Sequence, residues 1–305
     1  MKLGMIGLGR MGGNMAERLL RGGHRVVGFA RRPEGLDRLL RLGLGAEGVT
    51  ALPALAQKLK TPRTVWLMIP AGGAVDQMLE MLIPVLARGD IIVDGGNSYY
   101  KDTMRRAGML SGRALRFVDS GTSGGIWGLT EGYSMMVGGQ RETVEVLRPI
   151  FETLAPGKDR GWGHVGPHGA GHFVKMVHNG IEYGMMQALA EGFAIMKRKE
   201  EFDLDLHQVA QIWRYGSVVR SWLLDLTARA LADDQQLASV APHVADSGEG
   251  RWTVAEALDL DVPAPVITLS LLQRFRSRDQ YSFADRLLAM MRHQFGGHEF
   301  RRGQS

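Results

Sequence analysis

A glycine-rich turn near the start of the chain sets the strongest limit on its fold. Residues 2–6 form a short apolar run, residues 7–12 follow the pattern G-x-G-x-x-G, and a helical pattern continues to about residue 21. In the order strand, turn, helix, this pattern is typical of dinucleotide-binding domains, because glycines permit the tight turn and the approach of a pyrophosphate. We therefore predict a Rossmann-like domain. Its expected cofactor contacts in this turn are Gly7, Leu8, Gly9, Arg10, Met11 and Gly12.

The residues after the second predicted strand indicate which dinucleotide binds. That strand covers residues 25–29 and is followed by Ala30, Arg31 and Arg32, and the next carboxylate is Glu34. An acidic residue here would bind the ribose 2′-hydroxyl of NAD, whereas guanidinium groups match the oxygens of a 2′-phosphate. We predict that NADP is preferred, with NAD as a second option. The alternative is a pair of solvated arginines on a loop.

Strands alternate with helices up to about residue 154, which is typical of an α/β fold with a doubly wound parallel sheet. The expected strands are residues 64–69, 90–93, 115–118 and 133–137, and the expected helices are residues 73–86 and 141–154. Two glycine-rich polar turns, residues 94–98 and 119–125, follow strands of this set. Ligands of such sheets bind beyond the carboxyl ends of the strands. We therefore expect a site that includes Asn97 and Ser123.

The second half of the chain has a different pattern. Strands are expected to stop near residues 161–169, and a proline-free helical pattern runs from about residue 168 to residue 196. Further helices are predicted at residues 207–214, 221–231, 253–260, 263–277 and 282–292. We therefore predict a Rossmann-like domain at residues 1–165, an all-α domain at residues 166–290 and a C-terminal tail at residues 291–305.

The long predicted helix carries a stripe of polar side chains. Counted from Lys175, the residues His178, Asn179, Glu182 and Tyr183 fall at i+3, i+4, i+7 and i+8, which share one helix face. The residues between them are mostly apolar and suit a core. Such a stripe is either a solvated surface or the lining of a cleft. After a dinucleotide-binding domain, the cleft is the better prediction.

Composition excludes several other kinds of site. None of the 305 residues is a cysteine, so a disulfide framework, a thiolate nucleophile and a Cys-ligated metal are excluded. The net charge is +5, but the basic residues are spread over many segments, so no nucleic-acid site is expected. No apolar run reaches the roughly 18 residues of a membrane span, and the first strand follows Met1 without a signal-like leader. We expect a cytoplasmic protein.

Six motifs together resemble those of the 6-phosphogluconate dehydrogenase family, within the wider β-hydroxyacid dehydrogenase group. They are GLGRMG at residues 7–12, IVDGGNS at 92–98, SGG at 123–125, KMVHNGIEY at 175–183, GRWT at 250–253 and FGGH at 295–298. The motifs span nearly the whole chain. Familiar members of the family have a longer all-α region, so this chain resembles a short form.

The resemblance implies roles for individual residues. Lys175 matches the general base of the family, Glu182 matches the general acid, and Asn179 belongs to the catalytic set, while Asn97 is implied to contact the cofactor as well as the substrate. The implied substrate-binding residues are Asn97, Ser123, Gly124, Gly125, His178, Asn179, Tyr183, Arg274, Arg292 and His298.

The resemblance also implies a second subunit. Arg292 and His298 match an arginine and a histidine that the family takes from the tail of a neighbouring subunit, so a homodimer or homotetramer with a shared active site is expected. Arg274 matches an arginine for the substrate phosphate. Two departures affect the same phosphate contacts: Ser247 stands where the family has a lysine, and Glu249 stands where it has a small polar residue.

The implied reaction is the oxidative decarboxylation of 6-phosphogluconate to ribulose 5-phosphate and CO2 with reduction of NADP, a step of the pentose phosphate pathway. Lys175 would take the proton of the C3 hydroxyl while hydride leaves C3, and Glu182 would protonate C1 after CO2 is lost. No metal is expected, because the C3 ketone accepts the electrons of decarboxylation. Two alternatives remain: another β-hydroxyacid dehydrogenase, such as a 3-hydroxyisobutyrate-type enzyme, and a catalytically silent nucleotide-binding sensor.

Overall fold

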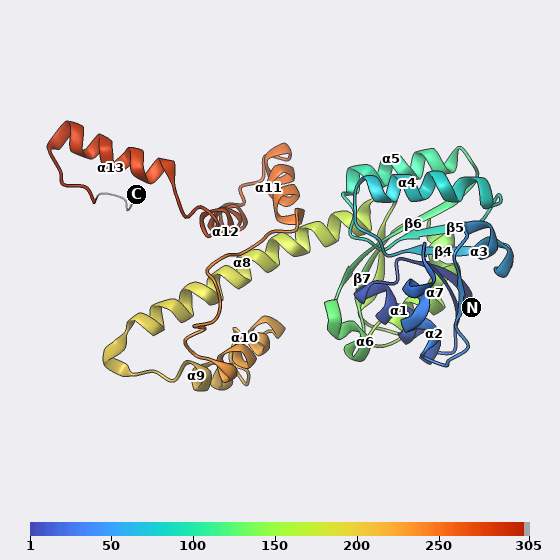
Figure 1. The fold of residues 1–305 in the computed structure, drawn as a ribbon, viewed down its shortest axis with the longest axis horizontal. Coiled ribbons are helices and arrows are strands. Elements are labelled where there is room, and N and C mark those ends of the chain that lie inside the picture. Colours follow the sequence, from blue (N-terminus) through green and yellow to red (C-terminus); the bar gives the residue numbers. More distant parts are fainter. Residues whose placement is uncertain (302–305) are drawn as a thin grey trace. The chain divides into compact units, whose positions relative to one another are not determined.

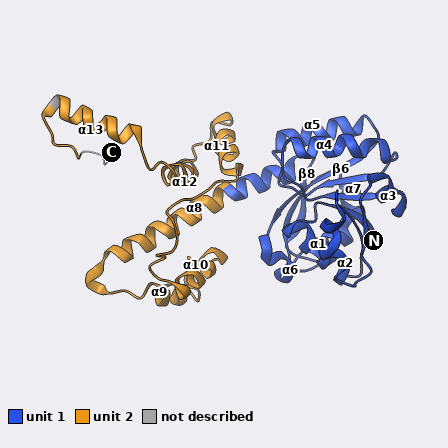
Figure 2. Ribbon diagram, viewed as in Figure 1, with its two compact units in different colours: residues 1–179 blue, residues 180–305 orange. Residues whose placement is uncertain are grey.

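The chain forms two compact units, which divide between residues 179 and 180 (Figure 2). The computed structural model describes residues 1–301, so residues 302–305 of the predicted tail lie outside the described residues. The division falls inside the long helix α8 (Ala170–Arg198), later than the predicted boundary at residue 165. The first turns of α8 therefore belong to the sheet unit, and the rest of α8 belongs to the helical unit.

A single mixed sheet organises the first unit (Figure 1). Its strands are β1 (Lys2–Ile6), β2 (Arg25–Phe29), β3 (Glu47–Val49), β4 (Thr64–Leu67), β5 (Ile91–Asp94), β6 (Arg116–Ser123), β7 (Ser134–Gly139) and β8 (Trp162–Gly166). Within the described residues their order is β3-β2-β1-β4-β5-β6-β7-β8, and β1 to β6 run parallel. The sequence order reverses between β1 and β4, which is the switch point where dinucleotides bind. The predicted doubly wound α/β fold is confirmed.

Strand β7 is an exception within the predicted parallel sheet, because it pairs antiparallel with β6. Residues 124–133 connect the two strands and contain two short turns of helix, η3 (Gly125–Trp127) and α6 (Gly128–Glu131). A parallel connection needs a crossover of about a dozen or more residues, so this link is too short for one. Strand β8 pairs parallel with β7 and was not predicted; it lies within residues 161–169, where strands were expected to stop.

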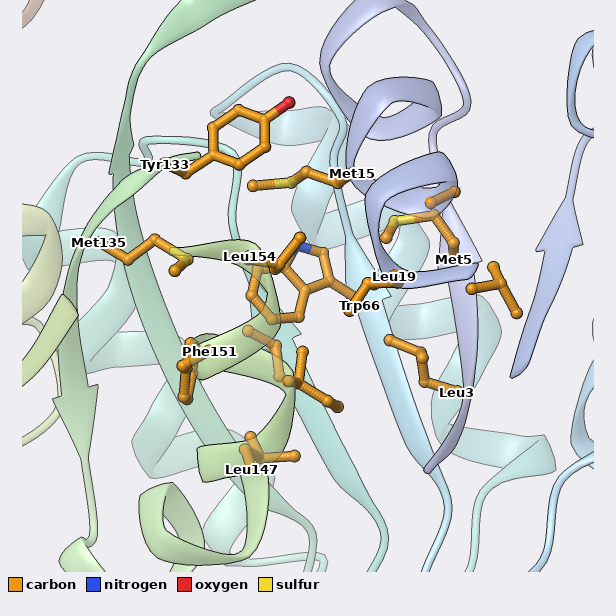
Figure 3. Close-up of a cluster of buried hydrophobic side chains, with 14 of the residues drawn as sticks. Leu3, Met5, Met15, Leu19, Trp66, Tyr133, Met135, Leu147, Phe151 and Leu154 are labelled. Carbon is orange, nitrogen blue, oxygen red and sulfur yellow. The ribbon is translucent and has the colours of Figure 1, made fainter. Parts of the chain in front are cut away.

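Helices cover both faces of the sheet, because alternate residues of its buried strands point to opposite faces. Trp66 faces the cluster formed with α1 (Arg10–Arg21) and α7 (Arg141–Leu154), where its ring lies 5.8 Å from that of Phe151 (Figure 3). Val65 and Leu67 face the opposite cluster. Helices α3 (Leu52–Lys58), α4 (Gly73–Leu82) and α5 (Tyr100–Ser111) pack there. The remaining short elements of this unit are α2 (Asp37–Leu40), η1 (Pro33–Leu36) and η2 (Ile83–Val85).

The second unit consists of helices, as predicted. After α8 come η4 (Glu200–Phe202), α9 (Leu206–Trp213), α10 (Trp222–Asp233), α11 (Glu249–Asp259), α12 (Pro265–Arg276) and α13 (Phe283–Gly296). One buried cluster joins α8, α9 and α10 around Phe193, Leu206 and Leu224. None of the helices in residues 1–301 has both the length and the apolar character needed to cross a membrane.

Candidate active site

In the glycine-rich turn after β1, two of the predicted glycines lie where a side chain would clash with the backbone. Gly7 has φ +92°, and a Cβ there would lie 2.2 Å from the carbonyl oxygen of Met68. A Cβ on Gly12 would lie 1.9 Å from the carbonyl oxygen of Gly7. By contrast, no atom of the described chain lies within 4 Å of the corresponding point at Gly9, where α1 begins. The turn therefore leaves open space for a ligand at the N-terminus of the helix.

A cavity of about 410 Å³ lies beside this turn, at the carboxyl ends of β1, β2 and β4. Its lining includes Gly7, Leu8, Gly9, Ala30, Arg31, Ile69 and Pro70. Arg31 is therefore at the predicted cofactor position, and the exposed Arg32 follows it. The open backbone at Gly9 and the guanidinium group of Arg31 fit the pyrophosphate and the 2′-phosphate of a dinucleotide.

The two polar turns are joined to each other through Asn97. Its side-chain amide donates to the carbonyl oxygen of Thr122 (3.0 Å), and its Oδ1 accepts from the backbone N–H of Thr122 (2.8 Å). Asn97 has φ +52°, a left-handed conformation that asparagine tolerates. Behind it, the buried carboxylate of Asp94 accepts from the N–H of Gly96 and from the hydroxyl of Ser98. The structure thus joins Asn97 to the turn that contains Ser123, through the preceding residue Thr122.

The turn after β6 exposes its backbone to the same edge of the sheet. Ser123 ends β6, Gly124 has φ +124° and Gly125 has φ +52°. Within residues 1–301, no atom lies within 4 Å of a Cβ built on Gly125. A ligand can therefore approach the backbone closely here.

Three residues at the start of the polar stripe form a group that we call the Lys175 cluster. Lys175 is 5% exposed, and its Nζ lies 3.2 Å from Nδ1 of His178 and donates to Oδ1 of Asn179. The same Oδ1 lies 3.2 Å from Nδ1 of His178. A Cβ on Gly121 of β6 would lie 2.4 Å from the Cβ of Lys175, so the lysine side chain begins directly above the strand. The solvated-surface interpretation of the stripe fails for this buried amine.

Sequence reasoning missed the residues that hold the start of α8. Asp119 of β6 is fully buried and accepts hydrogen bonds from the N–H groups of Gly169 and His172. The side chain of His172 is 1% exposed, and its Nδ1 lies 2.7 Å from Oγ1 of Thr103 on α5. The available signal was an aspartate directly after the apolar residues 117–118, since a carboxylate is rarely buried without partners.

In the helical unit, Tyr183, Arg274, Ser247 and Glu249 form a second group, the Tyr183 cluster. The guanidinium carbon of Arg274 lies 3.5 Å from the centre of the Tyr183 ring, and Nη1 of Arg274 donates to the carbonyl oxygen of Ala245 (2.7 Å). The hydroxyl of Tyr183 accepts from the N–H of Ser247 (3.2 Å), and the hydroxyl of Ser247 donates to Glu249. Of the two departures from the family pattern, Ser247 therefore contacts Tyr183 directly, and Glu249 contacts Ser247.

The remaining predicted residues are placed as follows. Glu182 lies on α8 two turns after Lys175 and is partly exposed. Arg292 is exposed on α13, and His298 is exposed just after this helix, where its carbonyl oxygen lies 3.0 Å from Nδ1 of His293. The structure thus gathers Arg274 with Tyr183, whereas it places Arg292 and His298 on the exposed C-terminal segment.

Comparisons with known proteins show which family the chain resembles over its two domains. A family model for the NAD binding domain of 6-phosphogluconate dehydrogenase matches residues 2–166, and one for the C-terminal domain of 6-phosphogluconate dehydrogenase matches residues 171–299. The NAD(+)-dependent, decarboxylating 6-phosphogluconate dehydrogenase of Haloferax volcanii is 45% identical, with 99% of both chains covered.

Longer relatives match over part of their length. The NADP(+)-dependent, decarboxylating 6-phosphogluconate dehydrogenase of Bacillus subtilis is 39% identical over 90% of this chain and 61% of its own length. Among solved structures, the 6-phosphogluconate dehydrogenase of Plasmodium falciparum has a TM-score of 0.85 and 29% identity, and the match covers 100% of this chain and 67% of that one. The described fold and both family models agree, and the chain belongs to the 6-phosphogluconate dehydrogenase family.

Proposed function

We propose that the chain converts 6-phosphogluconate and NADP+ to ribulose 5-phosphate, CO2 and NADPH. The observation that carries this proposal is the buried amine of Lys175, held by His178 and Asn179 directly above β6. Membership of the family and the names of its relatives support the same reaction. No feature of residues 1–301 favours the 3-hydroxyisobutyrate-type enzyme or the silent sensor.

The first chemical step belongs to the Lys175 cluster. Neutral Lys175 accepts the proton of the C3 hydroxyl, while the hydride of C3 would pass to NADP+ held by the glycine-rich turn and Arg31. Asn179 and His178 restrict where the amine can point, so the geometry is set before the substrate arrives. As charge develops on the C3 oxygen during loss of CO2, the ammonium group of Lys175 stabilises it.

The last step is the protonation of C1, which we assign to Glu182. It follows Lys175 by two helical turns, about 10 Å of rise, so acid and base serve different carbons of an extended sugar acid. Asn97, Ser123, Gly124 and Gly125 contact the substrate in this proposal.

Binding of the substrate phosphate is assigned to Arg274 and Tyr183. Arg274 stacks on the Tyr183 ring and is held by the carbonyl oxygen of Ala245, which leaves guanidinium N–H groups that suit phosphate oxygens. Ser247 supplies a hydroxyl rather than a cation at this place, so we assign the remaining positive charge to Arg292 and His298 of a second subunit.

The second subunit is itself part of the proposal. The helical unit exposes large apolar side chains, among them Val218, Leu258 and Phe283. A second copy that covers such a surface is the usual solution for a chain of this kind. Truncation after residue 290 should raise the KM for 6-phosphogluconate, and an unchanged KM would exclude a role of the tail. The cytoplasmic location stays a prediction.

The cofactor preference is assigned to Arg31 and Arg32. Relatives use NAD+ or NADP+, so family membership leaves the choice open. The position of Arg31 at the cavity, whose described lining contains no carboxylate, supports NADP. A higher kcat/KM with NAD+ than with NADP+ would overturn this assignment.

The reaction is tested by measuring NADPH, NADH and CO2 formation with 6-phosphogluconate, gluconate and 3-hydroxyisobutyrate. We expect coupled reduction and CO2 release with 6-phosphogluconate and weak turnover of the two phosphate-free acids. Preferential oxidation of 3-hydroxyisobutyrate, or reduction without CO2 release, would refute the proposal.

A further inference from the structure

We propose that Asp119 is a positioning residue for Lys175, because its buried carboxylate fixes the start of α8 on the sheet. This inference rests on the proposed function, since it concerns the base of that reaction. Asp119 does not touch the reacting atoms in this proposal. It fixes the distance of α8 from the sheet and the rotation of α8 about its own axis, and so the position of Lys175.

The carboxylate of Asp119 binds two backbone N–H groups at the beginning of α8. Oδ1 accepts from the N–H of Gly169 at 2.8 Å, and Oδ2 accepts from the N–H of His172 at 3.0 Å. The first N–H groups of a helix have no partner within the helix, and the helix dipole favours a negative charge beside them. Both oxygens are therefore used, and each bond points to a different residue of the first turn.

The helix contacts the sheet without intervening side chains. A Cβ on Gly171 would lie 2.4 Å from the carbonyl oxygen of Met136 on β7, and a Cβ on Gly121 would lie 2.5 Å from the carbonyl oxygen of Gly171. Strands β6 and β7 and the first turns of α8 are thus in backbone contact. The side chain of Lys175 begins directly above Gly121. A shift of α8 relative to β6 would therefore move the amine of Lys175 with it.

A third contact limits the rotation of the helix about its axis. Nδ1 of His172 lies 2.7 Å from Oγ1 of Thr103, which connects the same turn of α8 to α5. Nε2 of His172 is buried and has no hydrogen-bond partner in residues 1–301. The turn is therefore held from β6 by Asp119 and from α5 by Thr103, and Lys175 follows it by less than one helical turn.

The test uses two substitutions of Asp119 in the full chain. Asp119→Leu keeps the approximate shape and removes both acceptors, and Asp119→Asn keeps one acceptor. Misplacement of a reacting group by about 1 Å costs roughly 100-fold in rate, so kcat of Asp119→Leu should fall roughly 100-fold per folded molecule. Loss of one such bond should lower kcat of Asp119→Asn about tenfold. The dissociation constant for NADP+ should change by less than about threefold in both, because the glycine-rich turn is untouched.

A matched control separates positioning from general stability. Asp90 is also fully buried and also accepts from two backbone N–H groups, those of Arg63 and Ala87, at the other end of the sheet unit. Asp90→Asn should lower the midpoint of thermal unfolding while kcat per folded molecule stays within about twofold of the wild type. If Asp119→Leu does not fold, Asp119→Asn carries the comparison.

Two readouts report on the mechanism directly. With substrate deuterated at C3, the primary isotope effect on kcat of the Asp119 variants should equal or exceed that of the wild type, because cleavage of the C3–H bond is the step that a displaced base slows. Amide hydrogen exchange of a peptide covering residues 169–175 should be faster in the Asp119 variants and unchanged in Asp90→Asn.

The experiments distinguish a wrong role for Asp119 from a wrong proposed function. An Asp119→Asn variant with wild-type kcat, a smaller isotope effect than the wild type, or an equal loss of kcat in Asp90→Asn would each exclude a positioning role. If the wild type does not turn over 6-phosphogluconate, the proposed function fails. In that case unchanged exchange of residues 169–175 in Asp119→Leu would still exclude the anchoring contact on its own.

Discussion

The sheet unit and the helical unit bury apolar side chains to very different extents. The sheet unit has a buried cluster on each face of its sheet, and residues such as Trp66 and Leu79 are fully buried there. In the helical unit, the buried cluster around Leu224 joins three helices, while Val218 is 100% exposed and Phe283 is 71% exposed. Hydrophobic burial is the main favourable contribution to folding. The sheet unit therefore gains more of its folding free energy from contacts within itself than the helical unit does.

The proposed catalytic residues are therefore supported in two different ways. Lys175 belongs to the unit with extensive packing and lies against β6, whereas Tyr183 and Arg274 belong to the unit with exposed apolar surface. We therefore infer that the oxidation step depends on packing within one chain, and that binding of the phosphate depends on association with a second copy. Four sets of substitutions test the two units separately.

The largest effect is expected from Lys175→Met. This change removes the proposed base, and general-base catalysis contributes about 10²–10⁴-fold, so NADPH formation should fall at least to that extent. Binding of NADP+, followed by fluorescence titration, should be unchanged. Substantial turnover in this variant would exclude the base role. Glu182→Gln, on the other side of the division in α8, should slow the final protonation, and an unchanged kcat would exclude its acid role.

The next effect compares one buried leucine in each unit. Leu79 and Leu224 are both fully buried. Replacement of such a leucine by alanine costs about 2–5 kcal/mol of unfolding free energy. We expect the loss in Leu79→Ala to be independent of protein concentration. The loss in Leu224→Ala should grow on dilution, because association stabilises that unit by mass action. Urea unfolding at two protein concentrations measures the loss of unfolding free energy in each variant. An equal concentration dependence in the two variants would show that association does not stabilise the helical unit more than the sheet unit.

A smaller effect is expected from Gly121→Ala. Its Cβ would lie 2.4 Å from the Cβ of Lys175, and overpacking of this kind costs about 1–3 kcal/mol. Activity should fall as well, because α8 must move away from β6. Gly108 is the matched control: it lies inside α5, and apart from its neighbours in that helix no atom of the described residues is within 4 Å of its Cβ position. Gly108→Ala should stabilise the chain by about 0.5–1 kcal/mol. Similar effects of both changes on activity would contradict the close contact of α8 with β6.

The smallest effect concerns stability in acid. Two hydrogen bonds from the buried guanidinium group of Arg106, helped by Arg105, lower the pKa of Asp76 from 3.8 to about 2, although partial burial opposes the shift. A carboxylate whose pKa is lower in the folded state contributes stability above its unfolded pKa and loses it as the pH falls through the folded value. The difference in unfolding free energy between wild type and Asp76→Asn should therefore be constant above about pH 5 and shrink between about pH 4 and pH 2. Chemical unfolding across this range tests it, and a difference that persists at about pH 2 would contradict the sign.

The sequence predicted those features that depend on local patterns. The dinucleotide turn, the alternation of strands and helices, and the helical second half follow from short-range periodicity and from glycine sterics. The one-face stripe on α8 also follows from helix geometry, and Lys175 and Asn179 contact each other as their spacing requires.

Features that depend on long-range pairing could not be predicted in the same way. The direction of β7 depends on the length of its connection, and the glycines of β8 weaken its strand signal. Asn97 was expected to face ligands, but the bonds of its side chain to Thr122 depend on the packing of β6 beside β5. The contact of Asp119 with α8 joins residues about fifty positions apart, which periodicity does not report.

The paired bonds between Asn97 and Thr122 have a consequence for the thermodynamics of ligand binding. They order the turns 94–98 and 119–125 when the chain folds. Fixing a backbone residue costs about 1–2 kcal/mol of conformational entropy, and here this cost is met during folding. A sugar acid that enters the site therefore does not have to order these turns, and more of its contact energy remains available as affinity.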